Sequence, residues 1–326
     1  MRTVIIYGSL LGCSLLGAWL RWTKEPSLVS EDEVVVLYGE ADKIEKLHWE
    51  SEKSDIQIEA QENGSFFRVK YVDKKKKRKA DQKPETKECK GSQKIDRQLT
   101  NLSPLVAKRK LQSLQPKRRT EVGLDKPTTK LTITRKGQQE TIDFSKKQSS
   151  SYYVQLPKNG ELFLLASSKV SNFEGSLKSL CNYKLWSFDR KELKEISKAT
   201  LQTPAGKKLE MEQKNWQDQS KAKWINSKKP EEENKQLSNW IARALKELTI
   251  RSYVGSDIDQ QKLEAKFSLT IEKESKPAET LDILYHPETK EWYGRSDFSK
   301  GLVSISKQRV KLLHDDVAAL VGAEAQ

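Results

Sequence analysis

The chain has 326 residues, of which 35% are apolar and 33% are charged, with a mean hydropathy of −0.77 and a net charge of +14. This polar balance excludes a protein with many membrane spans, and three cysteines exclude a disulfide-dense scaffold. Eight Trp, nine Tyr and eight Phe can furnish a hydrophobic core, so the composition predicts a folded body of one to three domains.

Residues 3–20 form an uncharged and mostly apolar run at the N-terminus. As a helix this run would span about 27 Å, which is close to the thickness of a bilayer core. Trp19 and Trp22 lie where aromatic side chains meet the membrane surface. A cleaved signal peptide has a shorter apolar run, and a lipoprotein signal at Cys13 would end the run there. We therefore expect an uncleaved membrane anchor at 1–24, followed by a linker at 25–41.

The first soluble unit, unit A, is predicted at 42–120. Apolar residues alternate along 44–49, 56–60 and 66–72, which predicts three strands, and Asn63-Gly64 marks the turn before the third. A helix is expected at 94–114, where apolar residues recur at steps of three and four, with Pro104 as a kink or a break.

One stretch overlapping unit A holds the whole charge excess. Residues 68–119 contain 19 Lys or Arg and 5 Asp or Glu, and the peak is a run of six basic residues: Lys74, Lys75, Lys76, Lys77, Arg78 and Lys79. Like charges repel one another, so we expect a solvated, mobile insertion at 73–93. The run either contacts an anion, such as anionic lipid or an anionic polymer, or only keeps a loop soluble. No aromatic residue lies between Tyr71 and Arg119, which argues against a stacking platform for nucleic acid.

Three further units repeat the scheme of strands followed by a helix. Unit B (121–188) has strand patterns in a hairpin at 131–144, at 152–154 and at 162–165, and a helix at 168–180. Unit A′ (189–254) has strands near 193–201 and 209–211, a third near Trp216 and Trp224, and a helix after Pro230. Unit B′ (255–326) has strands at 267–271, 281–285, 292–294 and 301–305, and a helix after Ser306. The order A, B, A′, B′ predicts an internal duplication. The expected fold class is α+β: an N-terminal transmembrane helix and then tandem antiparallel meanders, each with a helix on one face.

Several of these segments resemble a known bacterial family, that of "domain of unknown function 4340". The resemblance covers 42–250 and is clearest in Glu121-Val122-Gly123-Leu124-Asp125-Lys126-Pro127, the hairpin at 131–144, Tyr152-Tyr153-Val154, Leu162-Phe163-Leu164-Leu165, Ser176-Leu177 to Trp186-Ser187-Phe188-Asp189, and 193–201. It implies one N-terminal anchor, a body outside the cytoplasm and, for some members, a link to ABC transport systems of the gliding-motility type. It implies no catalytic residue. The chain departs from the family at 74–92 and 213–229.

The motifs of common catalytic sites are missing from the sequence: there is no GxSxG, Walker A, HExxH or CxxC. His48, His286 and His314 are far apart, so each is expected at the surface or half-buried. Asp257 and Asp259 lack the number of ligands that a Ca²⁺ loop needs. Asp315 and Asp316 on the last helix could bind a cation, but we favour a solvated helix face there. We therefore expect no enzyme activity, no metal site and no cofactor.

Two cysteines of the soluble part, Cys89 and Cys181, lie 92 residues apart. They could pair if the body lies in an oxidising compartment. Two independent free thiols are the expectation that we favour, because Cys89 falls in the basic insertion.

Together these features predict a non-enzymatic, membrane-anchored and extracytoplasmic accessory protein, single-pass in the inner (cytoplasmic) membrane. Its expected partner is a protein of an envelope complex, and the family resemblance points to an ABC transporter or a gliding-type machine. The alternative is a body that faces the cytoplasm and binds anionic lipid or nucleic acid through 68–119. The flanking charges Arg2, Arg21 and Lys24 nearly balance and do not decide between the two orientations.

Overall fold

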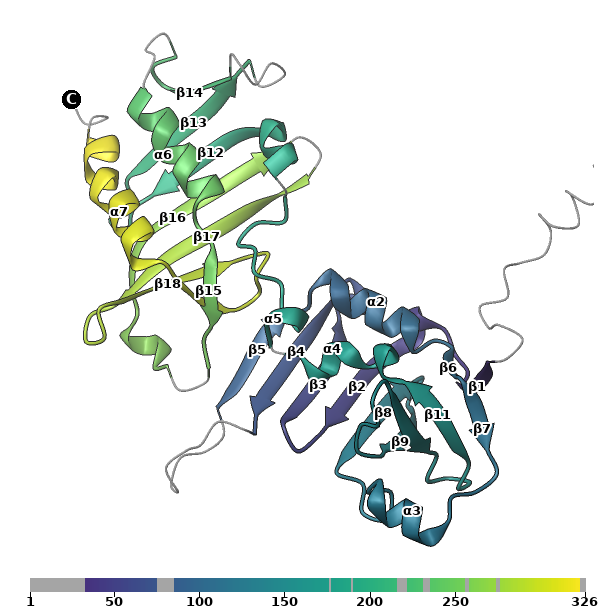
Figure 1. Ribbon diagram of the computed structural model, residues 1–326. Coiled ribbons are helices and arrows are strands. Elements are labelled where there is room, and N and C mark those ends of the chain that lie inside the picture. The colour runs from purple at the N-terminus through teal and green to yellow at the C-terminus, as the bar shows by residue number, and fades with distance from the viewer. Residues whose placement is uncertain are drawn as a thin grey trace, which may run out of the picture.

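The computed structural model describes residues 33–74, 85–175, 177–188, 190–215, 222–230, 235–255, 258–273 and 276–322. Two large antiparallel sheets lie next to each other, one from each half of the chain (Figure 1). A small third sheet pairs β1 (Val34–Leu37) with β6 (Leu105–Ala107).

The first large sheet has nine strands in the order β5-β4-β3-β2-β8-β9-β10-β11-β7. Their bounds are β2 (Ile44–Glu50), β3 (Ser54–Gln61), β4 (Phe66–Asp73), β5 (Thr86–Lys90), β7 (Arg109–Leu111), β8 (Thr129–Arg135), β9 (Gln138–Phe144), β10 (Ser151–Gln155) and β11 (Leu162–Ala166). The sheet is continuous because β2 pairs with β8 along its length, with Leu47 opposite Ile133.

The second large sheet has eight strands in the order β14-β13-β12-β16-β17-β18-β19-β15. Their bounds are β12 (Ile196–Gln202), β13 (Lys208–Lys214), β14 (Lys223–Asn226), β15 (Ile250–Tyr253), β16 (Glu264–Lys273), β17 (Lys276–His286), β18 (Glu291–Ser296) and β19 (Leu302–Ile305). Here β12 pairs with β16, as β2 pairs with β8 in the first sheet.

The strand orders of the two large sheets correspond one to one over eight strands. In each, a three-stranded meander is followed by a helix and by a strand at the far edge, β7 or β15, and a four-stranded meander then fills the space between. The first sheet has one strand more, β5, which lies outside β4.

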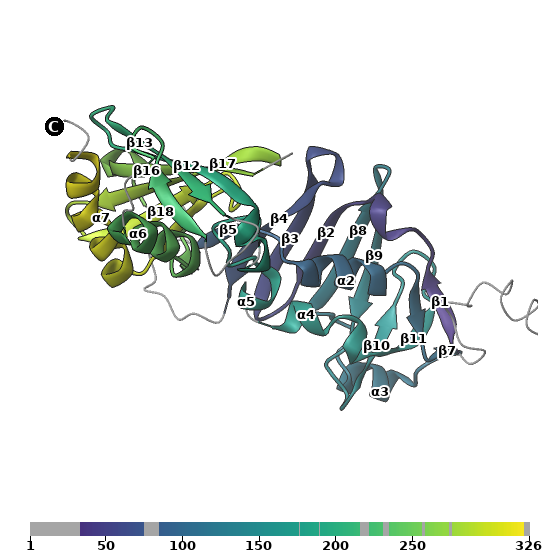
Figure 2. The same cartoon turned by 90° about the horizontal axis from the view of Figure 1, so that it is seen from above.

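Helices cover one face of each large sheet (Figure 2). Their bounds are α2 (Gln93–Asn101), α3 (Pro116–Glu121), α4 (Ser171–Glu174), α5 (Leu177–Leu180), α6 (Lys235–Lys246) and α7 (Lys307–Gly322), and short 3₁₀ turns lie at Ala41–Lys43, Glu62–Gly64, Ser167–Lys169, Arg190–Glu195 and Gln260–Lys262. Ser92 caps α2 by accepting a hydrogen bond from the backbone N–H of Lys94. The indole of Trp240 in α6 donates to the carbonyl of Leu313 in α7 (2.9 Å), which joins the two helices of the second sheet.

The core lies between each sheet and its helices. In the first half, Trp49 packs edge-on against Phe144, with ring centroids 5.2 Å apart, and stacks on Phe173 from α4 at 5.5 Å. In the second half, Trp240 lies 6.0 Å from Phe267 of β16. Full burial of an aromatic side chain contributes about 1.5–3 kcal/mol, so these clusters hold the helices on the sheets.

The structure corrects the predicted fold class. The described chain is mainly β, with three antiparallel sheets, and units A and B join in one sheet through β2 and β8 instead of folding as separate meanders with helices. The predicted helix at 94–114 ends at Asn101, because 105–107 and 109–111 pair as β6 and β7. The predicted helix at 168–180 is reduced to the single turns α4 and α5.

The predicted membrane location is corrected as well. The anchor at 1–24 lies outside the described residues, and within the described ranges no helix is both long and apolar enough to cross a bilayer. The structure therefore does not support a single-pass protein of the inner membrane with an N-terminal transmembrane helix.

Part of the predicted basic insertion at 73–93 forms a strand. Residues 75–84 lie outside the described residues, but 86–90 form β5 and pair with β4 along its length. The sequence analysis missed this strand because its composition is polar. As an edge strand, β5 buries one side chain, that of Cys89.

A basic cleft between the two sheets

The two large sheets meet at the edge strands β5 and β15. Lys87 of β5 forms an isolated antiparallel bridge with Gly255, which follows β15. A cleft of about 310 Å³ opens beside this contact. It is lined by Phe66, Arg68, Thr86, Glu88, Cys89, Lys90, Val254, Gly255, Gln260, Lys300, Gly301 and Leu302. The cleft thus takes its walls from β4 and β5 in the first half and, in the second, from the residues after β15, the turn at Gln260 and the start of β19.

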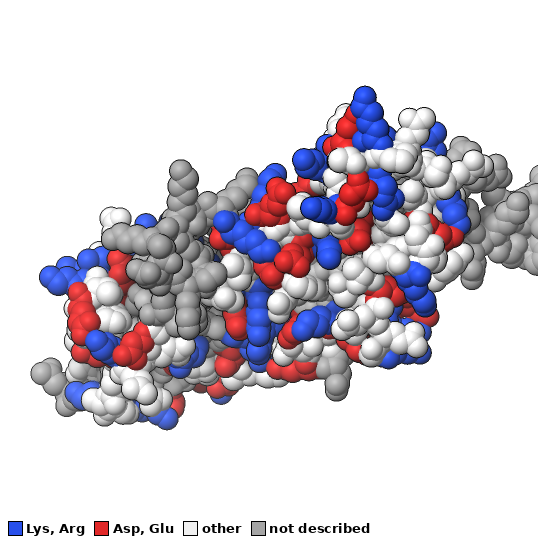
Figure 3. Space-filling model, turned by 90° about the horizontal axis from the view of Figure 1, so that it is seen from below, with Lys and Arg blue, Asp and Glu red and all other residues white. Residues whose placement is uncertain are grey.

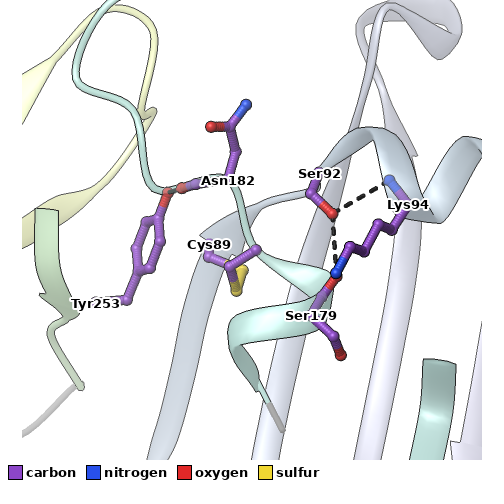
Figure 4. Close-up of a disulfide and its surroundings, with 7 residues drawn as sticks. Cys89, Ser92, Lys94, Ser179, Asn182 and Tyr253 are labelled. Carbon is purple, nitrogen blue, oxygen red and sulfur yellow. Dashed lines mark hydrogen bonds between the residues drawn. A yellow bond between two sulfur atoms is a disulfide. The ribbon is translucent and has the colours of Figure 1, made fainter. Parts of the chain in front are cut away.

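A disulfide between Cys89 and Cys181 fixes the chain beside this cleft (Figure 4). The two Cα atoms are 5.7 Å apart, and both cysteines are buried. The backbone N–H of Ser92 donates to the carbonyl of Leu180 (2.8 Å), and that of Asn182 donates to the carbonyl of Lys90 (2.9 Å). Residues 180–182 therefore run along the outer edge of β5, and the expectation of two free thiols is wrong.

Tyr253 of β15 connects this edge to the second sheet. Its hydroxyl donates a hydrogen bond to the carbonyl of Asn182, and Figure 4 shows the ring reaching towards that residue. Burial raises the pKa of the Tyr253 phenol, and the neighbouring Tyr183 raises it further. The phenol therefore stays protonated and keeps its role as a donor.

Two basic residues face each other across β4 and β5. Alternate residues of a strand share one face, and the register places Arg68 opposite Lys90 and Lys70 opposite Glu88. The second pair is complementary, with 3.7 Å between Lys70 Nζ and Glu88 Oε1. The first pair is repulsive, and like charges directly opposite each other destabilise a sheet. On its other side Arg68 lies opposite Glu59 of β3, whose carboxylate pairs with Lys46 at 2.8 Å. Among the described residues, no carboxylate lies within ion-pair distance of Arg68 or Lys90.

A third cation reaches the cleft from the turn between β18 and β19. Lys300 Nζ lies 3.5 Å from Glu62 Oε1 and 5.9 Å from the centroid of the Phe66 ring. Lys90 Nζ lies 5.4 Å from the same ring and 3.8 Å from that of Phe298. Burial lowers the pKa of Lys90, and the charge of Lys300 lowers it further, whereas Glu279 and Glu62 act in the opposite direction. The lysines thus share an aromatic wall and repel each other.

The cleft offers positive charge, an aromatic wall and neutral hydrogen-bonding groups. Three cations and one carboxylate line it, together with the hydroxyl of Thr86 and the amide of Gln260. No histidine is among its lining residues, and its one cysteine is held in the disulfide. This set of groups is suited to hold an anion, and it lacks the usual nucleophile and base pairs of hydrolases.

The predicted anion contacts at Lys74–Lys79 lie mostly beyond the described residues. Lys74 is described, and its Nζ lies 3.3 Å from Glu50 Oε1; Lys75, Lys76, Lys77, Arg78 and Lys79 are not described. Sequence analysis placed Arg68 and Lys90 in the basic stretch but did not bring them together, because that requires the register of β5. It gave no sign of Lys300, which is far away in the chain.

The other candidate residues from the sequence do not converge. His48 Nε2 lies 3.0 Å from Asp55 Oδ1, and His314 lies on α7 with its ring 5.2 Å from that of Trp292. His286 is buried, with 4% of its surface exposed, which corrects the expected surface or half-buried position. Asp316 pairs with Arg243 at 2.6 Å, and Asp259 caps a 3₁₀ turn, while Asp257 is not described. Over the described ranges, no three metal-ligating side chains group together.

A family described as "Domain of unknown function (DUF4340)" matches residues 91–270. The chain belongs to this family. The predicted family is thereby confirmed, although the matched DUF4340 region begins and ends later than the expected 42–250. Arg68, Lys90 and Lys300 all lie outside the DUF4340 region, whereas Val254, Gly255 and Gln260 lie within it. No curated protein and no solved structure matches the chain.

Proposed function

We propose that the protein is a non-enzymatic binding protein that holds an anionic group of its partner in the cleft between the two sheets. The observation that carries this proposal is the pair Arg68 and Lys90, which face each other across β4 and β5 with no carboxylate within ion-pair distance among the described residues. Glu59, which lies opposite Arg68 on β3, pairs with Lys46 instead. A repulsive cross-strand pair costs stability, and such local conflicts are typical of functional sites. An anion between the two side chains would turn this repulsion into two attractive contacts.

The disulfide supports a place of action where thiols are oxidised. Disulfides persist in oxidising compartments and are rare where glutathione and thioredoxin keep thiols reduced. Cys89 and Cys181 are buried and joined, so the protein would be assembled in such a compartment. The bacterial source and the ABC-type or gliding-type partner implied by the family resemblance stay predictions.

The alternative function, a broad contact of 68–119 with anionic lipid or nucleic acid, finds less support. β5 and β7 lie at opposite edges of the nine-stranded sheet, so the two basic ends of this stretch do not form one surface. Around β7 and α3, three of the six basic residues at 108–110 and 117–119 are already paired: Lys110 with Glu161, Arg118 with Glu121, and Arg119 with Asp125. Among the described residues, basic and acidic side chains also alternate over the face drawn in Figure 3.

A thermal-shift series tests the proposed function. The oxidised full-length protein is melted with increasing citrate, phosphate and sulfate, alongside the double variant Arg68→Ala/Lys90→Ala. An anion that binds only the folded state raises the melting temperature, and the shift grows with the logarithm of its concentration once this exceeds the Kd. We expect at least one anion to stabilise the wild type more than the double variant. Equal shifts in the two proteins would mean that the anions act outside the cleft and would refute the proposal.

The matched control is the double variant Lys147→Ala/Lys158→Ala, which removes two positive charges, as the double cleft variant does. Both lysines are exposed and lie in the turns before and after β10, far across the sheet from β5. It should keep the full anion-induced shift.

A further inference from the structure

We infer that the anionic group held in the cleft is the doubly charged phosphoryl group of a small phosphomonoester. This inference rests on the proposed function and narrows it to one class of ligand. It goes beyond a general preference for negative charge because the number of cations, the aromatic wall and the size of the cleft each limit what fits.

The number of charges favours a dianion. Arg68, Lys90 and Lys300 supply three positive charges, and Glu88 is the one acidic side chain in the lining. Glu88 is also engaged by Lys70, and Lys300 lies 3.5 Å from Glu62, so Arg68 and Lys90 remain as the two cations for a ligand. A carboxylate ligand would leave at least one of these charges without a partner. A phosphomonoester carries about −1.5 to −2 charges at pH 7 and three acceptor oxygens, which matches this set.

The kinds of cation point the same way. The guanidinium of Arg68 presents paired donors that match two oxygens of a phosphoryl group, and lysine ammonium groups serve as point charges on such a group. The two lysines come from different sheets, Lys90 from β5 and Lys300 from the turn before β19. A bound dianion would therefore join the two halves of the molecule.

The aromatic wall limits the rest of the ligand. Phe66 lines the cleft between the two lysines, at 5.4 Å from Lys90 Nζ and 5.9 Å from Lys300 Nζ. A planar or apolar group attached to the phosphoryl oxygen can pack against this ring. The volume of about 310 Å³ lies at the lower end of the range for small-molecule pockets. The ligand is thus a compact monoester.

Three probes with the same ring separate the alternatives: phenyl phosphate, phenyl sulfate and benzoate. Each is titrated into the oxidised full-length protein by calorimetry at about pH 7.5, where only phenyl phosphate is a dianion. One further charge-assisted contact corresponds to about a tenfold change in affinity. We expect phenyl phosphate to bind at least about ten times more tightly than the other two, and more tightly than inorganic phosphate because of the Phe66 ring.

The pH dependence gives an independent signature. The charged groups that face the ligand are Arg68, Glu88 and Lys90 from β4 and β5 and Lys300 from the second sheet. Glu62 beside Lys300, Glu59 opposite Arg68 and Glu279, which acts on Lys90, lie around them. The ordinary pKa values of these side-chain types lie outside the range of about 5.5 to 7.5. The second pKa of a phosphoryl group is about 6, so the affinity for phenyl phosphate should fall about fourfold from pH 7.5 to pH 5.5. Further protonation of Lys90 would act with the opposite sign and raise the affinity.

Two single variants locate the site. Arg68→Ala and Lys300→Ala should each weaken phenyl phosphate about tenfold, and both residues are exposed, so the fold should tolerate their loss. Lys147→Ala, between β9 and β10, should bind as the wild type does. Circular dichroism of each variant verifies folding.

The outcomes distinguish this inference from the proposed function. If benzoate and phenyl sulfate bind as tightly as phenyl phosphate and lose affinity in Arg68→Ala, the anion-binding function stands and the phosphomonoester is wrong. Equal binding of inorganic phosphate would remove the role of Phe66 and overturn the monoester. If none of the probes binds and the thermal shifts are also absent, both proposals fail together.

Discussion

The two large sheets share one strand order but finish their corresponding edges in different ways. In the second sheet, β14 is the edge strand, and the hydroxyl of Ser238 in α6 bonds to both the N–H and the carbonyl of Trp224 at 3.2 Å. In the first sheet the equivalent strand, β4, is covered by a further strand, β5, which is itself tied down by the disulfide. An exposed strand edge can pair with other chains. The second half protects its edge with the side chain of Ser238, and the first half protects the edge of β4 with the additional strand β5.

This difference locates the origin of the cleft. Among the described residues, β5 is the strand of the first sheet that has no counterpart in the second, and it supplies Lys90, Glu88 and Cys89 to the lining. The shared strand order therefore provides the framework, and the candidate site arises where one half adds to it. A molecule with two identical edges would lack both the repulsive pair and the bridge from Lys87 to Gly255.

The largest expected loss of stability comes from removing the disulfide with Cys89→Ala/Cys181→Ala, which should loosen the edge of the first sheet and leave that of the second unchanged. The bond joins residues 92 positions apart, and loss of a native disulfide costs about 2–4 kcal/mol of unfolding free energy. Urea denaturation measures this loss. Hydrogen exchange should speed up in β5 and at 180–182 but not in β14, because the edge of the second sheet is held by Ser238.

Cys13→Ala serves as the control, since it leaves the bond between Cys89 and Cys181 in place. Reduction of the wild type should reproduce the double variant. Unchanged hydrogen exchange in β5 after reduction would show that strand pairing alone holds this edge. It would contradict the view that the disulfide protects the edge of the first sheet.

The sequence predicted most strands of both sheets but not the feature that distinguishes them. Alternation along Ile56 and Ile58, and along Leu269 and Ile271, marks half-buried strands, and all four side chains are buried. β5 has no such pattern, because Cys89 is its one buried residue. Pairing between units A and B was also missed, since alternation shows which face of a strand is buried and not which strand lies beside it.

The candidate site could be predicted only in part for the same reason. The charge count singled out the stretch that contains Arg68 and Lys90. Their opposition depends on the register between β4 and β5, and Lys300 joins them only through the packing of two sheets. Long-range contacts of this kind leave no local signal in a single sequence.

A smaller effect is expected from Tyr253→Phe, which removes the hydroxyl that donates to the carbonyl of Asn182. Loss of one such hydrogen bond costs about 1 kcal/mol, measured as the shift in urea midpoint at unchanged slope. The ring itself stays, so packing against Tyr183 at 5.6 Å should persist. Tyr293→Phe is a suitable control, being another tyrosine of the second sheet that lies on β18. A loss of the same size in both variants would mean that the bond to Asn182 contributes nothing specific to the meeting of the sheets.

The smallest effect has the most informative sign: Lys90→Met should stabilise the protein. Removing one of two like charges on facing strands should raise the unfolding free energy by about 0.2–1 kcal/mol, while Lys70→Ala, which breaks the complementary pair with Glu88, should lower it.

The pH dependence of this difference has a definite sign. The pKa of Lys90 is lowered in the folded protein, so the wild type gains stability as pH rises from that lowered pKa towards the ordinary value of 10.5. The stability advantage of Lys90→Met over the wild type should therefore shrink over this range. Added salt should shrink it too, because screening weakens the repulsion. Denaturation of the two variants at low and high salt checks these signs. If Lys90→Met is destabilised and binds anions more weakly, Lys90 is a structural residue that packs against Phe66 and Phe298. If Lys90→Met is stabilised and no longer binds anions, the repulsive pair at β5 lowers stability and serves ligand binding.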